Sequence, residues 1–348
     1  MGMSARIQKP GELDLIRRSV FIGLALASFC FLSGCRSIPA SKSIPAPGKT
    51  GEEAAPPPES KFVKLTFPVS SESKSFPGWR TRSPGRPILL LHAINGLSPK
   101  LLHFALELER WGYRVYLPSL YGDPIGKDPA YGFDKDLSMI KFLRQDGRWN
   151  PVALDTVGQI EGDIAAIARW VSRVEGGRRI AVIGNSLTGA IPLKLLQEPR
   201  VGLAVLGQPA TPVPRIHGVM LRLPRPRAAL ESLSLTGEEW SGVTHALRRD
   251  SRKRIVGFHY VEDPLASIGR FEVLHEKLSH VGLAGRFSAY IMGPSGDSFS
   301  DEHRWVTSGE TAEKKSMLTP HSTFIDPENE SDRQWFRKRL RETLQRGW

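Results

Sequence analysis

Ser186 is the residue best placed to do chemistry, because it stands between a short apolar run and a helical pattern. The surrounding residues, 179–196, read RIAVIGNSLTGAIPLKLL. A serine at a tight strand-to-helix turn presents its hydroxyl to solvent, and the adjacent helix start offers free N–H groups that favour an anion. A nucleophile beside such donors is what acyl transfer requires. We therefore expect Ser186 to be an exposed nucleophile, against the alternative of an ordinary turn serine.

The turn around this serine departs from the pattern G-x-S-x-G. The residues are Gly184-Asn185-Ser186-Leu187-Thr188-Gly189, so Thr188 occupies the second glycine position and a glycine follows one place later. We expect the Thr188 side chain to narrow the floor of a site at this turn.

The elements around this turn alternate between strand and helix from Lys61 onward. An antiparallel pair opens the domain, and continuous apolar runs such as PILLLH indicate strands buried on both faces. The predicted strands are 61–69, 87–92, 113–118, 178–184, 201–207, 253–261 and 286–293; the predicted helices are 100–112, 155–174, one after Ser186, 236–250, 268–282 and 330–344. This order predicts an α/β domain with a mostly parallel sheet and helices on both faces.

Residues 88–126, ILLLHAINGLSPKLLHFALELERWGYRVYLPSLYGDPIG, carry a resemblance to a known family. Together with the serine turn they resemble the dienelactone hydrolase branch of the α/β-hydrolase family, over residues 61–348. The resemblance implies the α/β-hydrolase fold and oxyanion donors at the backbone N–H groups of Ile94 and Leu187. Relatives often have cysteine where Ser186 stands and glutamate where Ala93 follows His92. These departures favour a plain Ser-His-Asp mechanism over dienelactone turnover.

The acid of such a mechanism is expected after a later strand. Asp263 follows the apolar run RIVGFHYV and precedes Pro264, and the family order of serine, acid and histidine favours it. Glu262 is a rival acid. The alternative to a catalytic role is that Asp263 is a structural aspartate in a turn before proline.

The catalytic base is expected to be His321, in LTPHSTFIDPE before the last helix, with His303 as the alternative. Many relatives have their histidine directly after the preceding strand, where this chain has Asp297. The intervening loop, residues 294–318, is long enough to be a functional cover or a peripheral excursion. The histidines lack metal-ligand spacing, so no metal and no cofactor are expected.

The first residues indicate export and a lipid anchor. Arg17 and Arg18 precede the short apolar run 19–32, which ends in LSGC at Cys35. This resembles a bacterial lipoprotein signal, which implies removal of residues 1–34 and lipidation of Cys35; the alternative is an uncleaved membrane anchor. Arg36, in place of aspartate, favours the outer over the inner membrane. Residues 35–60 then form the lipidated cysteine and a Pro/Ala/Ser-rich tether, and residues 61–348 the hydrolase domain.

The formal net charge of +12 suggests an anionic partner. The basic clusters lack a nucleic-acid-binding motif, so they are interpreted as solvated faces near an anionic envelope, with no nucleic acid expected. The sequence thus predicts a membrane-tethered serine hydrolase that cleaves a small carboxylic ester through Ser186, Asp263 and His321. The alternatives are an acyltransferase or thioesterase with the same triad, or a silent lipoprotein that uses the fold for binding.

Overall fold

The computed structural model describes residues 57–69, 75–93, 96–120, 160–209, 235, 237–260, 269–292, 305–307 and 330–348. The chain separates into two compact units, 1–53 and 54–348, and all described residues lie in the second. Within these described ranges, no helix is long and apolar enough to cross a membrane.

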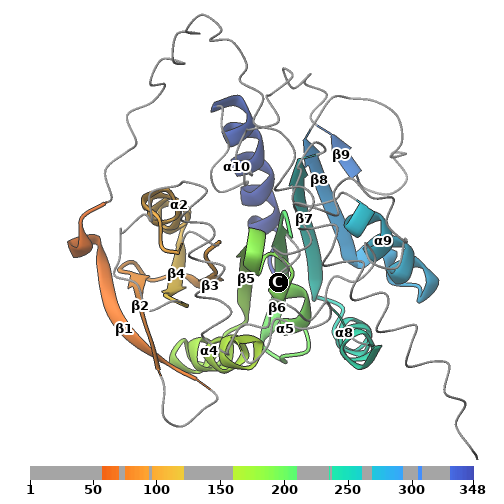
Figure 1. Ribbon diagram of the computed structural model, residues 1–348, viewed down its shortest axis with the longest axis horizontal. Coiled ribbons are helices and arrows are strands. Elements are labelled where there is room, and N and C mark those ends of the chain that lie inside the picture. Colours follow the sequence, from red (N-terminus) through yellow and green to blue (C-terminus); the bar gives the residue numbers. More distant parts are fainter. Residues whose placement is uncertain are drawn as a thin grey trace, which may run out of the picture. The chain divides into compact units, whose positions relative to one another are not determined.

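A nine-stranded sheet runs through the unit in the order β1-β2-β4-β3-β5-β6-β7-β8-β9 (Figure 1). Its strands are β1 (Phe62–Pro68), β2 (Ser75–Thr81), β3 (Arg86–Leu90), β4 (Tyr113–Pro118), β5 (Ile180–Asn185), β6 (Val201–Gly207), β7 (Arg254–Tyr260), β8 (Phe287–Met292) and β9 (Trp305–Thr307). β2 pairs antiparallel with both β1 and β4. From β4 to β9 every pairing is parallel. The carboxyl ends of these parallel strands therefore meet at one edge of the sheet.

Helices cover both faces of this sheet (Figure 1). α2 (Pro99–Arg110) and α10 (Glu330–Gln345) pack on one face. α4 (Ile160–Val174), α5 (Ile191–Leu195), α8 (Gly237–Arg249) and α9 (Gly269–His280) pack on the other. Single 3₁₀ turns lie at η1 (Glu59–Lys61), η2 (Ser186–Thr188) and η3 (Ala284–Arg286).

Local chemistry sets the limits of α2. The Ser98 hydroxyl accepts a hydrogen bond from the Leu101 N–H at 3.3 Å, and Pro99 occupies the first helical position. Both features favour a helix start. Gly112 then adopts a φ of 92°, a left-handed conformation that is easy for glycine and turns the chain into β4.

The core consists of two hydrophobic clusters separated by the sheet. Along β3, Leu89 contributes to the cluster under α4, α5, α8 and α9, while Ile88 and Leu90 contribute to the cluster under α2 and α10. All three side chains are fully buried. Burial of each stabilises the fold by about 1.5–3 kcal/mol, so both faces of the strand contribute.

The predicted α/β-hydrolase architecture is confirmed. Each strand and helix expected from the sequence is present, and helix 155–174 is described from Ile160 onward. The one strand that was not expected is β9, which pairs in parallel with β8 inside the segment interpreted as a long loop. Its three residues are too few to show a hydrophobic period in the sequence.

Candidate active site at the end of β5

The turn after β5 holds Ser186 in a strained backbone conformation. Asn185 ends the strand with an extended backbone, and Ser186 opens the helical turn η2 with a φ of 52°. A residue with a Cβ pays about 1–2 kcal/mol for this left-handed conformation. Such strain persists only where the surrounding structure enforces it, and it is concentrated at functional sites.

Two glycines in this turn allow its backbone to pack closely against neighbouring segments. A Cβ on Gly184 would lie 2.7 Å from Cδ of Pro192. A Cβ on Gly189 would lie 2.6 Å from the carbonyl oxygen of Gly207 and 2.6 Å from Cα of Pro209. The φ of Gly189 is an ordinary −59°, so this position excludes side chains for lack of space. The serine turn is therefore packed directly against the end of β6.

This packing corrects the expectation that Ser186 is exposed. Its relative exposure is 5%, and the neighbouring Leu187 is 6% exposed. The reason is the close contact of the turn with the Gly207–Pro209 segment, which a local strand-to-helix pattern does not reveal. Ser186 is thus a buried serine in the described part of the chain.

Thr188 holds the serine turn to the end of β3. Its hydroxyl accepts a hydrogen bond from the Asn185 N–H at 3.0 Å and donates one to the His92 carbonyl oxygen at 3.0 Å. The side chain is fully buried. The threonine that replaces the second glycine of the pattern therefore connects the serine turn with the residues that follow β3.

His92 is a neutral structural residue. Its Nε2 accepts a hydrogen bond from the Leu120 N–H at 2.9 Å, while Nδ1 lies 2.7 Å from the Ala93 carbonyl oxygen, which fixes Nδ1 as the protonated nitrogen. Burial lowers the pKa of His92 to about 4, and the hydrogen bond to Ala93 opposes that shift. With both nitrogens bonded to backbone, His92 fixes the ends of β3 and β4 and is not available as a base.

Gln208 is a site residue that the sequence analysis missed. It is fully buried and has a φ of 40°. Strand pairing sets Asn185 opposite Gly207, so the two strained residues Ser186 and Gln208 follow side by side at the ends of β5 and β6. In the described chain they are the two non-glycine residues with positive φ. In the sequence, the only signal that could have indicated Gln208 is that it is a polar residue between a buried strand and Pro209.

Of the predicted site residues, the structure describes Ser186 and Leu187, which stand together at the start of η2. The first N–H groups of a helical turn have no partner within it, so the Leu187 N–H is suited to donate a hydrogen bond to an anion. Several predicted residues lie outside the described residues: Ile94, Asp263 with its rival Glu262, His321 with its alternative His303, and Cys35. Within the described ranges, no three His, Cys, Asp or Glu side chains are grouped as a metal site would require.

Comparisons with known proteins agree with this architecture. Residues 88–342 match the model of the alpha/beta hydrolase family. No curated protein matches the chain in sequence. Among solved structures, the chain is similar to a putative dienelactone hydrolase from Klebsiella pneumoniae, at 15% identity and a TM-score of 0.44, over 66% of this chain and 85% of that one.

Two further structures show a similar degree of likeness. One is a dienelactone hydrolase from Anabaena variabilis, at 11% identity and a TM-score of 0.45, over 81% of this chain and 96% of that one. The other is a dienelactone hydrolase-like promiscuous phosphotriesterase from metagenomic libraries, at 10% identity and a TM-score of 0.48, over 82% of this chain and 98% of that one. Because the family model spans most of the sequence and includes the turn at Ser186, the chain belongs to the alpha/beta hydrolase family.

Proposed function

We propose that the protein is a serine hydrolase of the dienelactone hydrolase-like branch that cleaves carboxylic esters, with Ser186 as nucleophile. One observation carries the proposal: Ser186 keeps a φ of 52° at the junction of β5 and η2, although a less strained turn would connect them at lower cost. A strained serine at the start of a helical turn is the geometry of a nucleophile elbow.

In the proposed mechanism, His321 removes the proton from the Ser186 hydroxyl as the oxygen attacks the ester carbonyl. Asp263 accepts a hydrogen bond from the imidazole and stabilises its charged form. The N–H groups of Leu187 and Ile94 stabilise the oxyanion. Water, activated by the same histidine, then releases the acyl group and restores the serine. The assignments of Asp263, His321 and Ile94 rest on their order in the sequence.

Labelling with a fluorophosphonate probe tests the nucleophile. The wild-type protein should be labelled, and Ser186→Ala should lose both labelling and ester turnover by several orders of magnitude. The matched control is Ser241→Ala, at an exposed position on α8, which should behave as wild type. A protein that is never labelled would be a hydrolase fold used for binding, contrary to the proposal.

A pair of histidine variants tests the base. His321→Ala should lose nearly all acylation, while His303→Ala should retain most of it. Assays on a short-chain ester, a thioester and an acyl acceptor separate hydrolysis of oxygen esters from the two neighbouring reactions. An inactive His303→Ala beside an active His321→Ala would reverse the assignment.

We further propose that Cys35 carries a lipid and anchors the domain to the cell envelope. The support is the sequence LSGC after a short apolar run. Metabolic labelling with palmitate should mark the wild-type chain and not Cys35→Ala, which should leave the membrane fraction or remain unprocessed. Equal fractionation of both chains without palmitate incorporation would contradict the anchor.

A further inference from the structure

Six consecutive strands of the sheet begin beside an arginine. In spatial order β4-β3-β5-β6-β7-β8, the arginines are Arg114, Arg86, Arg179, Arg200, Arg254 and Arg286. Arg86 and Arg254 are the first residues of their strands, Arg114 is the second, and the other three directly precede theirs. We call this edge of the sheet, defined by these six residues, the arginine edge. It lies opposite the strand ends that carry Ser186.

Strand pairing aligns these arginines in two groups, with one step between them. The first group is Arg114, Arg86, Arg179 and Arg200, and the second is Arg254 and Arg286. The step arises because Leu203 pairs with Arg254, which sets Arg200 three residues earlier. Ile88 pairs with Ala181, so Arg86 and Arg179 stand two residues before the same level in β3 and β5. Ile255 pairs with Phe287, so Arg254 and Arg286 precede the same level in β7 and β8. Neighbouring strands lie about 4.8 Å apart, so six strands extend this row over roughly 24 Å.

The helix ends at the same edge add further positive charge. Helices antiparallel to the strands end where the strands begin. Their last turns contain the exposed arginines Arg110, Arg173, Arg248 and Arg249, and the exposed Arg346 directly follows α10. The row is therefore surrounded by guanidinium groups on both faces of the sheet.

Two carboxylates at this edge pair with arginines of the row. Glu175 binds Arg114 at 2.8 Å and is 5% exposed, and Asp250 pairs with Arg179. By contrast, Arg200 and Arg254 are exposed, and no carboxylate of the described chain pairs with either. The excess charge at this edge is therefore positive and faces outward.

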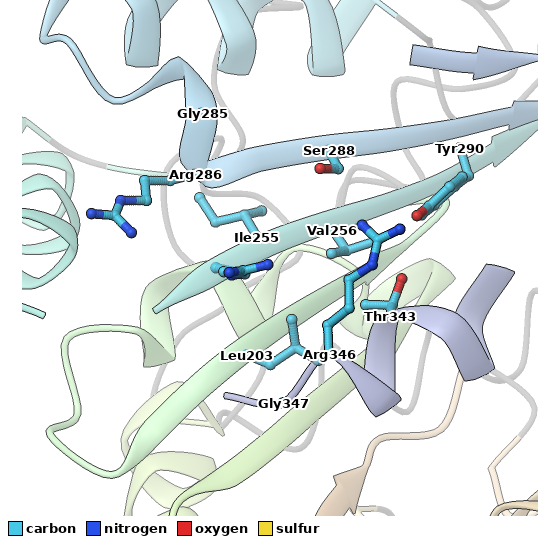
Figure 2. A pocket seen from close by; sticks show the side chains of 11 residues that line it. Leu203, Ile255, Val256, Gly285, Arg286, Ser288, Tyr290, Thr343, Arg346 and Gly347 are labelled. Atoms are coloured by element: carbon cyan, nitrogen blue, oxygen red, sulfur yellow. The ribbon is translucent and has the colours of Figure 1, made fainter. Parts of the chain in front are cut away.

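A recess at the arginine edge brings arginine and hydroxyl side chains together; of these, Thr343 donates to the Arg339 carbonyl oxygen and Arg286 to the Ser251 carbonyl oxygen. It is lined by Arg254, Arg286 and Arg346 together with the hydroxyl groups of Ser288, Tyr290 and Thr343. Figure 2 shows the Arg346 side chain running past Thr343 toward Tyr290. Guanidinium groups bind phosphate oxygens through paired N–H donors, which makes arginine better suited to this task than lysine.

The chain also enters the described domain at this edge. η1 precedes β1, which runs parallel to β4 through the intervening antiparallel β2, so both strands start at the same edge. Arg82, in the turn before β3, donates from Nε to the Ser60 carbonyl oxygen at 2.6 Å. The first described residues of the domain therefore lie on the same side as the arginine edge.

We propose that the arginine edge docks on the headgroups of an anionic phospholipid bilayer. The extent of the row, its surplus guanidinium groups, the recess and the point of chain entry all favour an extended phosphate-bearing surface on this side. Docking in this way directs the strand ends that carry Ser186 away from the bilayer. The proposal does not depend on the hydrolase chemistry proposed above.

Vesicle flotation tests this with the chain from residue 35 onward carrying Cys35→Ala, so that neither the apolar run 19–32 nor an acyl anchor contributes. Vesicles are phosphatidylcholine alone or phosphatidylcholine with phosphatidylglycerol. One variant adds Arg200→Gln and Arg254→Gln. The charge-matched control adds Lys100→Gln and Arg333→Gln, exposed positions in the first turns of α2 and α10. Each basic residue near an anionic surface contributes about 1 kcal/mol, so the first variant should bind anionic vesicles about thirtyfold more weakly.

The expected result is salt-sensitive binding to anionic vesicles, with the thirtyfold loss confined to the arginine variant and ester turnover unchanged in both. Equal binding to neutral and anionic vesicles, or equal losses in the two variants, would overturn the proposal. A duplex DNA arm is included because arginines also bind nucleic acid. Binding to DNA without binding to anionic vesicles would assign the edge to nucleic acid instead.

Discussion

The backbone strain at Ser186 can be measured by comparing glycine with alanine at this position. Both Ser186→Gly and Ser186→Ala remove the hydroxyl, so the difference between them reports the backbone alone. Alanine keeps the cost of a φ of 52°, about 1–2 kcal/mol, and glycine does not. The Ser186→Gly variant loses about 0.5–1 kcal/mol of stability, because glycine makes the unfolded chain more flexible. Ser186→Gly should therefore be the more stable variant by about 0.5–1 kcal/mol.

Ser241 on α8 provides the matched control, because it is exposed and its backbone is helical. There glycine should be less stable than alanine by about 1 kcal/mol. The preference for glycine or alanine should thus reverse between the two positions. Urea unfolding of the four variants, compared at equal m-values, gives the free energies of unfolding. If glycine is the less stable residue at both positions, the strain inferred at Ser186 does not exist.

Three further outcomes can be checked by unfolding or activity measurements. Burial lowers the folded pKa of His92 to about 4. In the unfolded chain the imidazole has a pKa of about 6.5, so below that pH it binds a proton that the folded protein does not bind. The free energy of unfolding of the wild type should therefore fall between pH 6.5 and 4, by about 2 kcal/mol at pH 5. The His92→Gln variant should not show this loss. Lys253→Met should lower the free energy of unfolding in urea by about 3 kcal/mol, because Nζ donates to three carbonyl oxygens at 2.7, 2.7 and 2.8 Å. The control Arg252→Met, at an exposed position, should change it little. Gly189→Ala should cost about 1–3 kcal/mol and reduce ester turnover, because its Cβ would lie 2.6 Å from the Gly207 oxygen.

The fold was predictable because its signals are local. Runs such as residues 201–207, VGLAVLG, are continuous and apolar, and all seven residues are buried in β6. The helices likewise show their buried positions at helical spacing, as in α4 with Ile160, Ile164, Ile167 and Val171. Each pattern reports how one element meets the core, and the strict alternation of strands and helices then leaves few topologies.

The site was predictable only in part, because its details depend on contacts between distant residues. The Thr188 hydroxyl binds the carbonyl of His92, 96 residues away in the sequence. The burial of Ser186 depends on the end of β6, and the strain at Gln208 is visible only in the backbone. A motif points to the turn at Ser186, but it carries no information about the residues that other strands bring against that turn.

The arginine edge was hidden from the sequence for a related reason. Each arginine stands at the start of an apolar run, and only the strand order turns six such residues into a row. The sequence also contains two contiguous basic clusters, and one of them, residues 248–254, lies at this edge.

The fold tolerates this concentration of positive charge because of where its helices end. The carboxyl end of a helix carries a partial negative charge, and a nearby cation stabilises it by about 0.3–1 kcal/mol. Arg110, Arg173 and Arg249 occupy such positions in α2, α4 and α8. Arg200 and Arg254, by contrast, lie at strand starts, where no helix end accounts for their charge. If the edge served helix stability alone, the positive charge would be confined to the helix ends; its continuation along the strand starts is why we propose a partner with negative charge.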